Sequence, residues 1–282
     1  MADKVDGLAI VAGSGVLPRM LAEDCKRSGR AYAVIKFEGI ALDWVTGHPV
    51  IPAVFEKPGR LFKDIARAGL KQVTFAGGMS RPKISPLRFD LTGIRLAPKL
   101  FKALKGGDDA ALRIVTEIFE AEGLSIVAAH ELLESLLVPE GVLTKGQPSD
   151  ADKADAARAA AIVEAIGAVD VGQGAVVAQG ICLGLESIQG TDAMLAHVAA
   201  TGGPFRPDAQ GAKGVLLKAP KPGQDWRTDL PAIGPDTLRN AHSAGLAGVV
   251  IEAGGVLVLG REEVVAQANA LEMFLWSRPR GT

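Results

Sequence analysis

The residues best suited to chemistry lie in the second half of the chain, at 218–229. An apolar run, 215–217, leads into a loop in which charged side chains stand between prolines and a glycine. The charged members are Lys218, Lys221, Asp225, Arg227 and Asp229. Carboxylate oxygens bind hard divalent cations, and lysine and arginine bind phosphoryl oxygens. The pattern therefore predicts metal and phosphate chemistry, although a solvated loop with local ion pairs is the simpler interpretation.

Two glycine-rich turns in the first half follow segments that read as buried strands, 7–12 and 72–76. Their residues are Gly13, Ser14 and Gly15, and Gly77, Gly78, Met79 and Ser80. Ligands of parallel sheets bind beyond the carboxyl ends of the strands, where backbone N–H groups face an anion. The two turns predict one nucleotide- or phosphate-binding crevice. Tight βα turns without a ligand are the simpler interpretation, since Pro18 stands where an NAD fingerprint has its third glycine.

These turns belong to an alternation of strand and helix patterns. Strands are expected at 7–12, 31–36, 72–76 and 125–129, and helices at 19–27, 58–69 and 110–122. Alternating elements predict a parallel sheet covered by helices, as in a Rossmann-like domain. Residues 81–105 look irregular and basic, which suits a solvated face or a surface for an anionic ligand or lipid headgroups.

The second half predicts another α/β domain. An apolar, glycine-spaced segment, 174–186, ends at Glu186, and helices are expected at 192–200, 235–244 and about 261–276. The window 248–259 reads as two buried strands joined by a turn at Ala253 and Gly254. We place an N-terminal Rossmann-like domain at 1–140, a polar linker at 141–155 and a C-terminal catalytic α/β domain at 156–282.

Composition excludes several classes of protein. The 282 residues are 48% hydrophobic and carry a net charge of −1, which suits two packed domains and argues against nucleic-acid binding. The two cysteines, Cys25 and Cys182, lack metal-ligand spacing and fit a reducing cytoplasm. We expect no signal peptide and no membrane span, and we expect a homodimer that pairs through the second half.

Taken together, the motifs resemble a known family. GSGVLP, FAGGMSRP, GGDDA, GLESIQGTDAM and LLKAPKPGQDWRTDLPAIGPDT are similar to segments of the UDP-2,3-diacylglucosamine pyrophosphatases of the LpxI type, which act in lipid A biosynthesis. The resemblance runs over essentially the whole chain. Its most specific parts are KPGQDWRTDLPAIG and LESIQGTD.

The resemblance implies a divalent-metal-dependent hydrolase that cuts UDP-2,3-diacylglucosamine into UMP and 2,3-diacylglucosamine 1-phosphate. It implies attack of water on the phosphorus next to the sugar, with the lipid held between two domains. It also implies a cytoplasmic enzyme in peripheral contact with the inner membrane. Asp225 stands at the family's essential acidic position.

The residue types agree with that chemistry. Asp225 is the first candidate for a metal ligand or general base, and Asp229 and Glu186 are further candidates for ligands of Mg²⁺ or Mn²⁺. Lys218 and Arg227 are candidates for stabilising the attacked phosphoryl group. The predicted substrate-binding residues are Gly13, Ser14, Gly15, Gly77, Gly78, Met79, Ser80, Thr191, Asp192, Lys221 and Gln224.

Two alternatives stay open at this point. A Rossmann-type oxidoreductase or nucleotide-sugar transferase would use the GSGVLP turn, although only Glu38 stands near the place of the expected acidic residue after the second strand. A non-catalytic nucleotide- or lipid-binding protein would need no metal and would leave the spaced carboxylates of the charged loop without a role.

Overall fold

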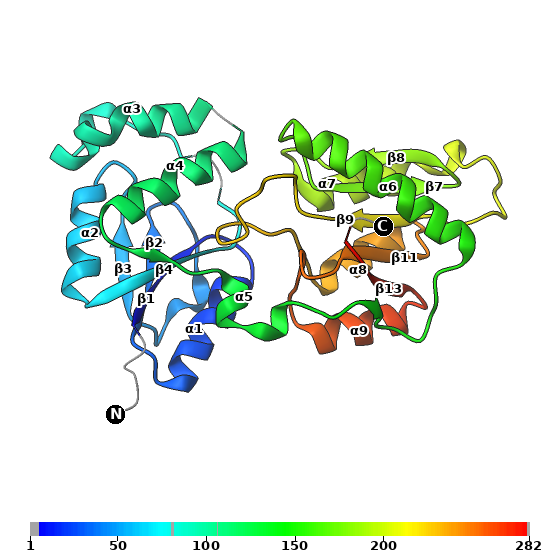
Figure 1. Cartoon of the computed structure of the whole chain (residues 1–282), viewed down its shortest axis with the longest axis horizontal. Helices are drawn as coiled ribbons and strands as arrows, with labels where there is room; N and C mark the ends of the chain where they lie inside the picture. Colours follow the sequence, from blue (N-terminus) through cyan, green and yellow to red (C-terminus); the bar gives the residue numbers. More distant parts are fainter. Residues whose placement is uncertain (1–5, 80–81, 106, 281–282) are drawn as a thin grey trace. The chain divides into compact units, whose positions relative to one another are not determined.

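The structure is a computed structural model that describes residues 6–79, 82–105 and 107–280. It divides into two compact units, each with its own large sheet (Figure 1). Unit 1 comprises Met1–Leu133 and the short segment Asp225–Asp229, and unit 2 comprises Glu134–Gln224 and Leu230–Thr282. The expected two-domain α/β fold is confirmed.

The sheet of unit 1 is parallel throughout, in the order β3-β2-β1-β4-β5. Its strands are β1 (Gly7–Ala12), β2 (Tyr32–Phe37), β3 (Val50–Ala53), β4 (Leu70–Ala76) and β5 (Ser125–Ile126). Every residue of β1 is buried, which explains its unbroken apolar sequence, because helices cover both faces of such a sheet. The strand order reverses between β1 and β4, and this is where doubly wound sheets bind ligands.

Five α-helices lie in the described part of unit 1. They are α1 (Leu17–Ser28), α2 (Pro58–Arg67), α3 (Leu91–Lys105), α4 (Asp108–Ala121) and α5 (Ala129–Leu132). Phe62 of α2 and Phe119 of α4 pack in one buried cluster with Val11 of β1. Successive strand residues point to opposite faces, so Ile10 lies on the other face of the sheet from Val11. The helix α1 packs on β1 and β2.

The expectation that 81–105 is irregular is wrong for Leu91–Lys105, which form α3. The Asp90 carboxylate stabilises its first turn by accepting a hydrogen bond from the backbone N–H of Gly93 at 2.6 Å. Gly93 and Ala103 are buried, and α3 packs against α2 and α4. Packing therefore overrides the weak helix propensity of Gly93 and Pro98.

The sheet of unit 2 is mixed, in the order β6-β13-β11-β9-β7-β8. Its strands are β6 (Gly141–Val142), β7 (Gly174–Ala178), β8 (Ile181–Leu185), β9 (Val215–Lys218), β11 (Gly248–Glu252) and β13 (Phe274–Arg278). The strands β13, β11 and β9 are parallel, and antiparallel strands extend the sheet on both sides. A separate parallel pair joins β10 (Ala232–Ile233) to β12 (Leu257–Val258).

Helices cover both faces of this sheet. One face packs on α6 (Asp150–Ala168), and the other packs on α7 (Gly190–Thr201), α8 (Pro235–Ser243) and α9 (Arg261–Ala270). Alternate residues of β9 serve the two faces, because Val215 and Leu217 join the α6 cluster while Leu216 joins the other. The stretch expected as a linker, 141–155, contains β6 and the first residues of α6.

One expectation for the C-terminal part of the chain is wrong and another is confirmed. The C-terminal helix ends at Ala270, and the apolar residues that follow form β13, because strand β11 offers them a parallel partner. The two buried strands expected in the window 248–259 are confirmed as β11 and β12, with a turn between them, and each pairs with strands of a different sheet. Within the described residues, no helix has the length and apolar character needed to span a membrane.

The packing of β11 on β13 generates a stability prediction. A Cβ atom at Gly248 would lie 2.5 Å from the buried ring of Phe274, so Gly248→Ala forces that ring to move. We expect a loss of about 1–3 kcal/mol in the free energy of unfolding, measured by urea denaturation. The matched control is Gly203→Ala, where an added Cβ meets no described atom within 4 Å. Equal stability of the two variants would contradict the packing described here.

Candidate functional site

The two predicted glycine turns lie side by side at the carboxyl ends of β1 and β4. The backbone N–H of Ser14 donates to the carbonyl of Gly78 at 2.7 Å, and the N–H of Gly78 donates back to the carbonyl of Ser14 at 3.1 Å. A Cβ atom at Gly13 would lie 2.4 Å from the carbonyl oxygen of Gly78. Glycine is therefore required for this approach, and the two turns lie together, as a shared binding crevice would need.

The joined turns occupy the point where the strand order of the sheet reverses. Ser14 and Gly15 are exposed, and α1 begins two residues after Gly15 with Leu17 and Pro18 in its first turn. Exposed backbone at the start of a helix is suited to an anion such as a nucleotide phosphate. Gly77, Gly78 and Met79 complete the second turn, and Ser80 lies outside the described residues.

In unit 2, Lys218 and Glu186 form a buried ion pair. Lys218 ends β9 and is 4% exposed, and Glu186 follows β8 and is 7% exposed. The distance from Lys218 Nζ to Glu186 Oε2 is 3.5 Å. The ammonium also donates to Thr191 Oγ1 at 2.7 Å and to the carbonyl of Ala232 at 3.4 Å. Thr191 lies in the first turn of α7, so the ion pair lies beside the N-terminus of this helix.

The Glu186 carboxylate is only partly satisfied. Among the described residues, Oε2 accepts no hydrogen bond, although Lys218 stands within ion-pair distance. A Cβ atom at Gly174 would lie 2.3 Å from this oxygen, so the glycine at that position leaves space for the Glu186 carboxylate. A buried acceptor without a hydrogen bond costs free energy, and the charge of Lys218 offsets part of that cost. Asp192, beside Thr191, instead accepts a hydrogen bond from Asn240 Nδ2 of α8 at 2.9 Å.

Lys221 and Gln224 hold the start of the charged loop in place. Lys221 Nζ lies 2.6 Å from Asp170 Oδ1, and the backbone N–H of Lys221 donates to Gln224 Oε1 at 2.9 Å. The Gln224 amide reaches Gln173 Oε1 at 3.5 Å. Both predicted substrate-binding side chains therefore have partners within unit 2, and their contacts fix the loop conformation.

The segment Asp225–Asp229 carries the most organised charge cluster. Arg227 Nη2 donates to Asp225 Oδ2 at 2.7 Å, and Arg227 Nε and the backbone N–H of Arg227 each donate to Asp225 Oδ1 at 3.0 Å. The other end of the guanidinium, Nη1, donates to Glu120 Oε1 of α4 at 2.9 Å. Arg227 thus bridges two carboxylates within unit 1, and one of them belongs to the predicted catalytic residue.

These contacts set the charge state of Asp225. Hydrogen bonding from the Arg227 side chain is the main cause that holds the pKa of the Asp225 carboxyl below its ordinary value, and partial burial opposes it. The same pair raises the pKa of Arg227. Both groups are therefore charged at neutral pH. A carboxylate with a lowered pKa is a weak general base, so the geometry favours an electrostatic or ligand role for Asp225.

The predicted metal ligands fit a hard cation in donor type. Asp225 and Asp229 share one segment of unit 1, whereas Glu186 belongs to unit 2 and faces a lysine ammonium. Within the described chain, no three histidine, cysteine, aspartate or glutamate side chains gather as a metal-binding group. Arg227 also occupies both oxygens of Asp225. A cation at Asp225 therefore competes with the Arg227 fork for the carboxylate oxygens.

Sequence reasoning missed the residues that hold the predicted site in place. Glu120 stands 107 residues before Arg227, and Asp170 stands 51 residues before Lys221. Neither lies in a motif, and an acidic residue near the end of a helix is ordinary. The signal that finds them is the ion pair itself, which exists only in the folded chain.

Two family models cover the chain. The LpxI N-terminal domain matches residues 7–136, and the LpxI C-terminal domain matches residues 139–276. These ranges include both glycine turns, the buried Lys218 pair and the segment Asp225–Asp229.

The chain is similar to one curated relative along nearly its full length. The UDP-2,3-diacylglucosamine pyrophosphatase LpxI of Caulobacter vibrioides is 42% identical over 268 residues, which span 95% of this chain and 96% of that protein. A solved structure of a CobK precorrin-6A reductase is 14% identical and aligns with a TM-score of only 0.31, over 99% of this chain and 89% of that one. Because both family models match and the relative aligns along nearly its full length, the chain belongs to the LpxI family.

Proposed function

We propose that this chain hydrolyses the pyrophosphate bond of UDP-2,3-diacylglucosamine. The observation that supports it most is the 42% identity, over 95% of the chain, to a protein named for that activity. Membership of this family favours hydrolysis over the alternatives of an oxidoreductase, a transferase or a binding-only protein. The products are UMP and 2,3-diacylglucosamine 1-phosphate.

In the proposed reaction, water attacks the phosphorus next to the sugar. The bond between that phosphorus and the bridging oxygen breaks, and the bridging oxygen leaves with UMP. The water oxygen stays on the sugar phosphate, and its protons pass to solvent. Both the substrate and the transition state are dense anions, so fixed cations must offset the charge that develops on the phosphoryl oxygens.

Arg227 is the proposed cation for this task. Its planar guanidinium suits two phosphoryl oxygens as well as it suits the Asp225 carboxylate. Glu120 keeps one edge of the group in place while the other edge exchanges partners. We propose that substrate phosphate draws Arg227 away from Asp225 and so frees the carboxylate.

Lys218 is a second candidate cation, supported by its charge and by its position beside the hydroxyl of Thr191. The paired turns at Gly13–Gly15 and Gly77–Met79 are proposed to bind the nucleotide through backbone N–H groups. Lys221 and Gln224 are proposed to act mainly by shaping the loop, because their side chains already have partners.

We also propose that the reaction depends on Mg²⁺ or Mn²⁺, with Asp225 and Asp229 as the first candidate ligands. Such an ion supplies positive charge to the phosphoryl oxygens, and magnesium commonly binds through one or two carboxylates plus substrate phosphates. Glu186 is the weaker candidate, because the ammonium of Lys218 lies 3.5 Å from its oxygen and repels a cation.

Hydrolysis in ¹⁸O-enriched water tests the proposed function. The full-length chain is mixed with UDP-2,3-diacylglucosamine and Mg²⁺, and the masses of both products are measured. We expect one ¹⁸O atom in 2,3-diacylglucosamine 1-phosphate and none in UMP, because water attacks the sugar-side phosphorus. Label in UMP would overturn the proposed point of attack, and the absence of cleavage would overturn the proposed function.

Removal of the metal tests the proposed cofactor. EDTA should reduce turnover to the background rate, and added Mg²⁺ should restore it. Asp229→Asn should raise the Mg²⁺ concentration needed for half-maximal rate, because it removes a ligand charge, whereas Glu186→Gln should leave that concentration unchanged. Full turnover in EDTA would rule out the metal, and a shift confined to Glu186→Gln would reverse the ligand assignment.

A further inference from the structure

The helix α3 of unit 1 has an unusual number of exposed apolar residues. The helix α3 packs on α2 and α4 (Figure 1), and several of its large apolar residues are exposed. Leu91 is 88% exposed and Ile94 is 60% exposed, and Phe101 continues the same stripe. Leu87, in the turn before the helix, is exposed as well. Scattered exposed apolar residues are ordinary, but a continuous group on one helix marks an interaction surface.

The charges of α3 have a single sign. Its sequence, LTGIRLAPKLFKALK, contains arginine and lysine and no acidic residue. At 100° per residue, Arg95, Lys99 and Lys102 fall on one exposed strip beside the apolar stripe. Arg95 is partly neutralised by Glu122 at 2.9 Å. An exposed apolar stripe with a cationic flank is the pattern of helices that lie in the interface of a bilayer.

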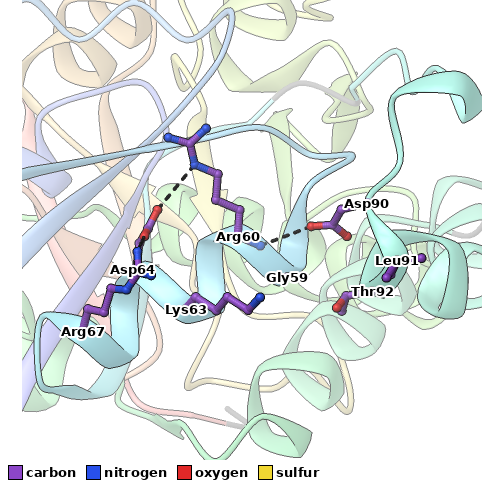
Figure 2. A pocket seen from close by; sticks show the side chains of 8 residues that line it. All are labelled: Gly59, Arg60, Lys63, Asp64, Arg67, Asp90, Leu91 and Thr92. Atoms are coloured by element: carbon purple, nitrogen blue, oxygen red, sulfur yellow. Dashed lines mark hydrogen bonds and ion pairs between the residues drawn. The ribbon is translucent and has the colours of Figure 1, made fainter.

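A basic pocket adjoins the start of the helix (Figure 2). It has a volume of about 560 Å³ and lies between α2 and the first residues of α3. Three cations of α2, Arg60, Lys63 and Arg67, line it together with two carboxylates, Asp64 and Asp90, and with Leu91 of α3. Asp64 forms ion pairs with both arginines, whereas the Lys63 amino group extends toward α3 in Figure 2. Cations therefore stand directly beside the most exposed apolar side chain of α3.

We infer that this α2–α3 surface docks unit 1 on the face of a bilayer that contains anionic lipids. Leu91, Ile94 and Phe101 enter the region between headgroups and acyl chains, while the flanking lysines contact lipid phosphates. This inference rests on the proposed function in one respect. The proposed substrate is a lipid, and a lipid substrate gives the chain a reason to bind a membrane. The residues proposed for hydrolysis are not part of this surface.

Charge favours a membrane over a second copy of the chain. Two copies that meet through α3 bring Lys99, Lys102 and their counterparts together, and like charges across an interface oppose binding. An anionic lipid surface instead attracts each of these groups. Salt should weaken the attraction, since exposed charges are screened within about 8 Å at physiological ionic strength.

Co-sedimentation with vesicles tests the inference without any turnover. The full-length chain is mixed with vesicles of phosphatidylcholine alone or with about a third of phosphatidylglycerol, and the bound fraction is measured. We expect binding to the anionic vesicles that weakens as salt rises, and little binding to the neutral vesicles. Loss of the two lysine charges alone should cost about thirtyfold in partition coefficient, at the usual contribution of a lysine near such a surface, and reversal of both charges should cost more.

The variants are matched by exposure. Lys99→Glu with Lys102→Glu tests the charge, and its control reverses two exposed lysines of unit 2, Lys145→Glu with Lys213→Glu. Leu91→Ser with Ile94→Ser tests the apolar stripe.

The apolar control is Val169→Ser with Phe205→Ser. In the native chain these two residues are 70% and 65% exposed. Melting curves show whether each variant is folded.

Loss of binding in both α3 variants, with both control variants like the native chain, supports the inference. Equal binding to neutral and anionic vesicles, or α3 variants that bind as the native chain does, would overturn it. A concentration-dependent dimer that Leu91→Ser with Ile94→Ser abolishes, with no vesicle binding, would assign the surface to a second copy. If the native chain hydrolyses no lipid substrate yet binds anionic vesicles as described, the proposed function fails and the surface stands.

Discussion

The Arg227 guanidinium between two carboxylates is the interaction on which the candidate site depends. It holds Asp225 on one side and Glu120 of α4 on the other, at 2.7 and 2.9 Å. The segment that carries it, Asp225–Asp229, comes from the second half of the sequence and belongs to unit 1. The same contact keeps Asp225 ionised, since hydrogen bonds from Arg227 lower its pKa. One side chain therefore fixes both the position and the charge of the residue proposed to be essential.

The ion pair of unit 2 is under a different constraint. Lys218 and Glu186 are almost fully buried, and removal of either partner leaves an uncompensated charge in a dry environment. Asp225 and Arg227 are more exposed, so either group is able to change partners at lower cost. This contrast supports the proposed roles, in which Lys218 is a fixed cation and Arg227 changes partners when substrate binds.

Much of the fold was predictable from sequence because the signals are local. Buried parallel strands such as GLAIVA read as unbroken apolar runs, and the glycine turns after β1 and β4 meet because parallel strands end at one edge. The failures involve long-range packing: α3 forms because α2 and α4 support it, and Phe274 continues a sheet rather than a helix because β11 lies beside it. Asp225 and Arg227 stand in one motif, whereas Glu120 becomes part of the site only through folding.

The most direct test of the account compares Asp225→Asn with Asp236→Asn, an aspartate in another exposed pair with arginine. Both variants should melt like the native chain. The value of kcat/KM for UDP-2,3-diacylglucosamine should fall by at least about a hundredfold in Asp225→Asn and stay near native in the control. Arg227→Lys should lie between them, since lysine keeps the charge but loses the fork. A folded Asp225→Asn variant with native kcat/KM would contradict the central role given to this carboxylate.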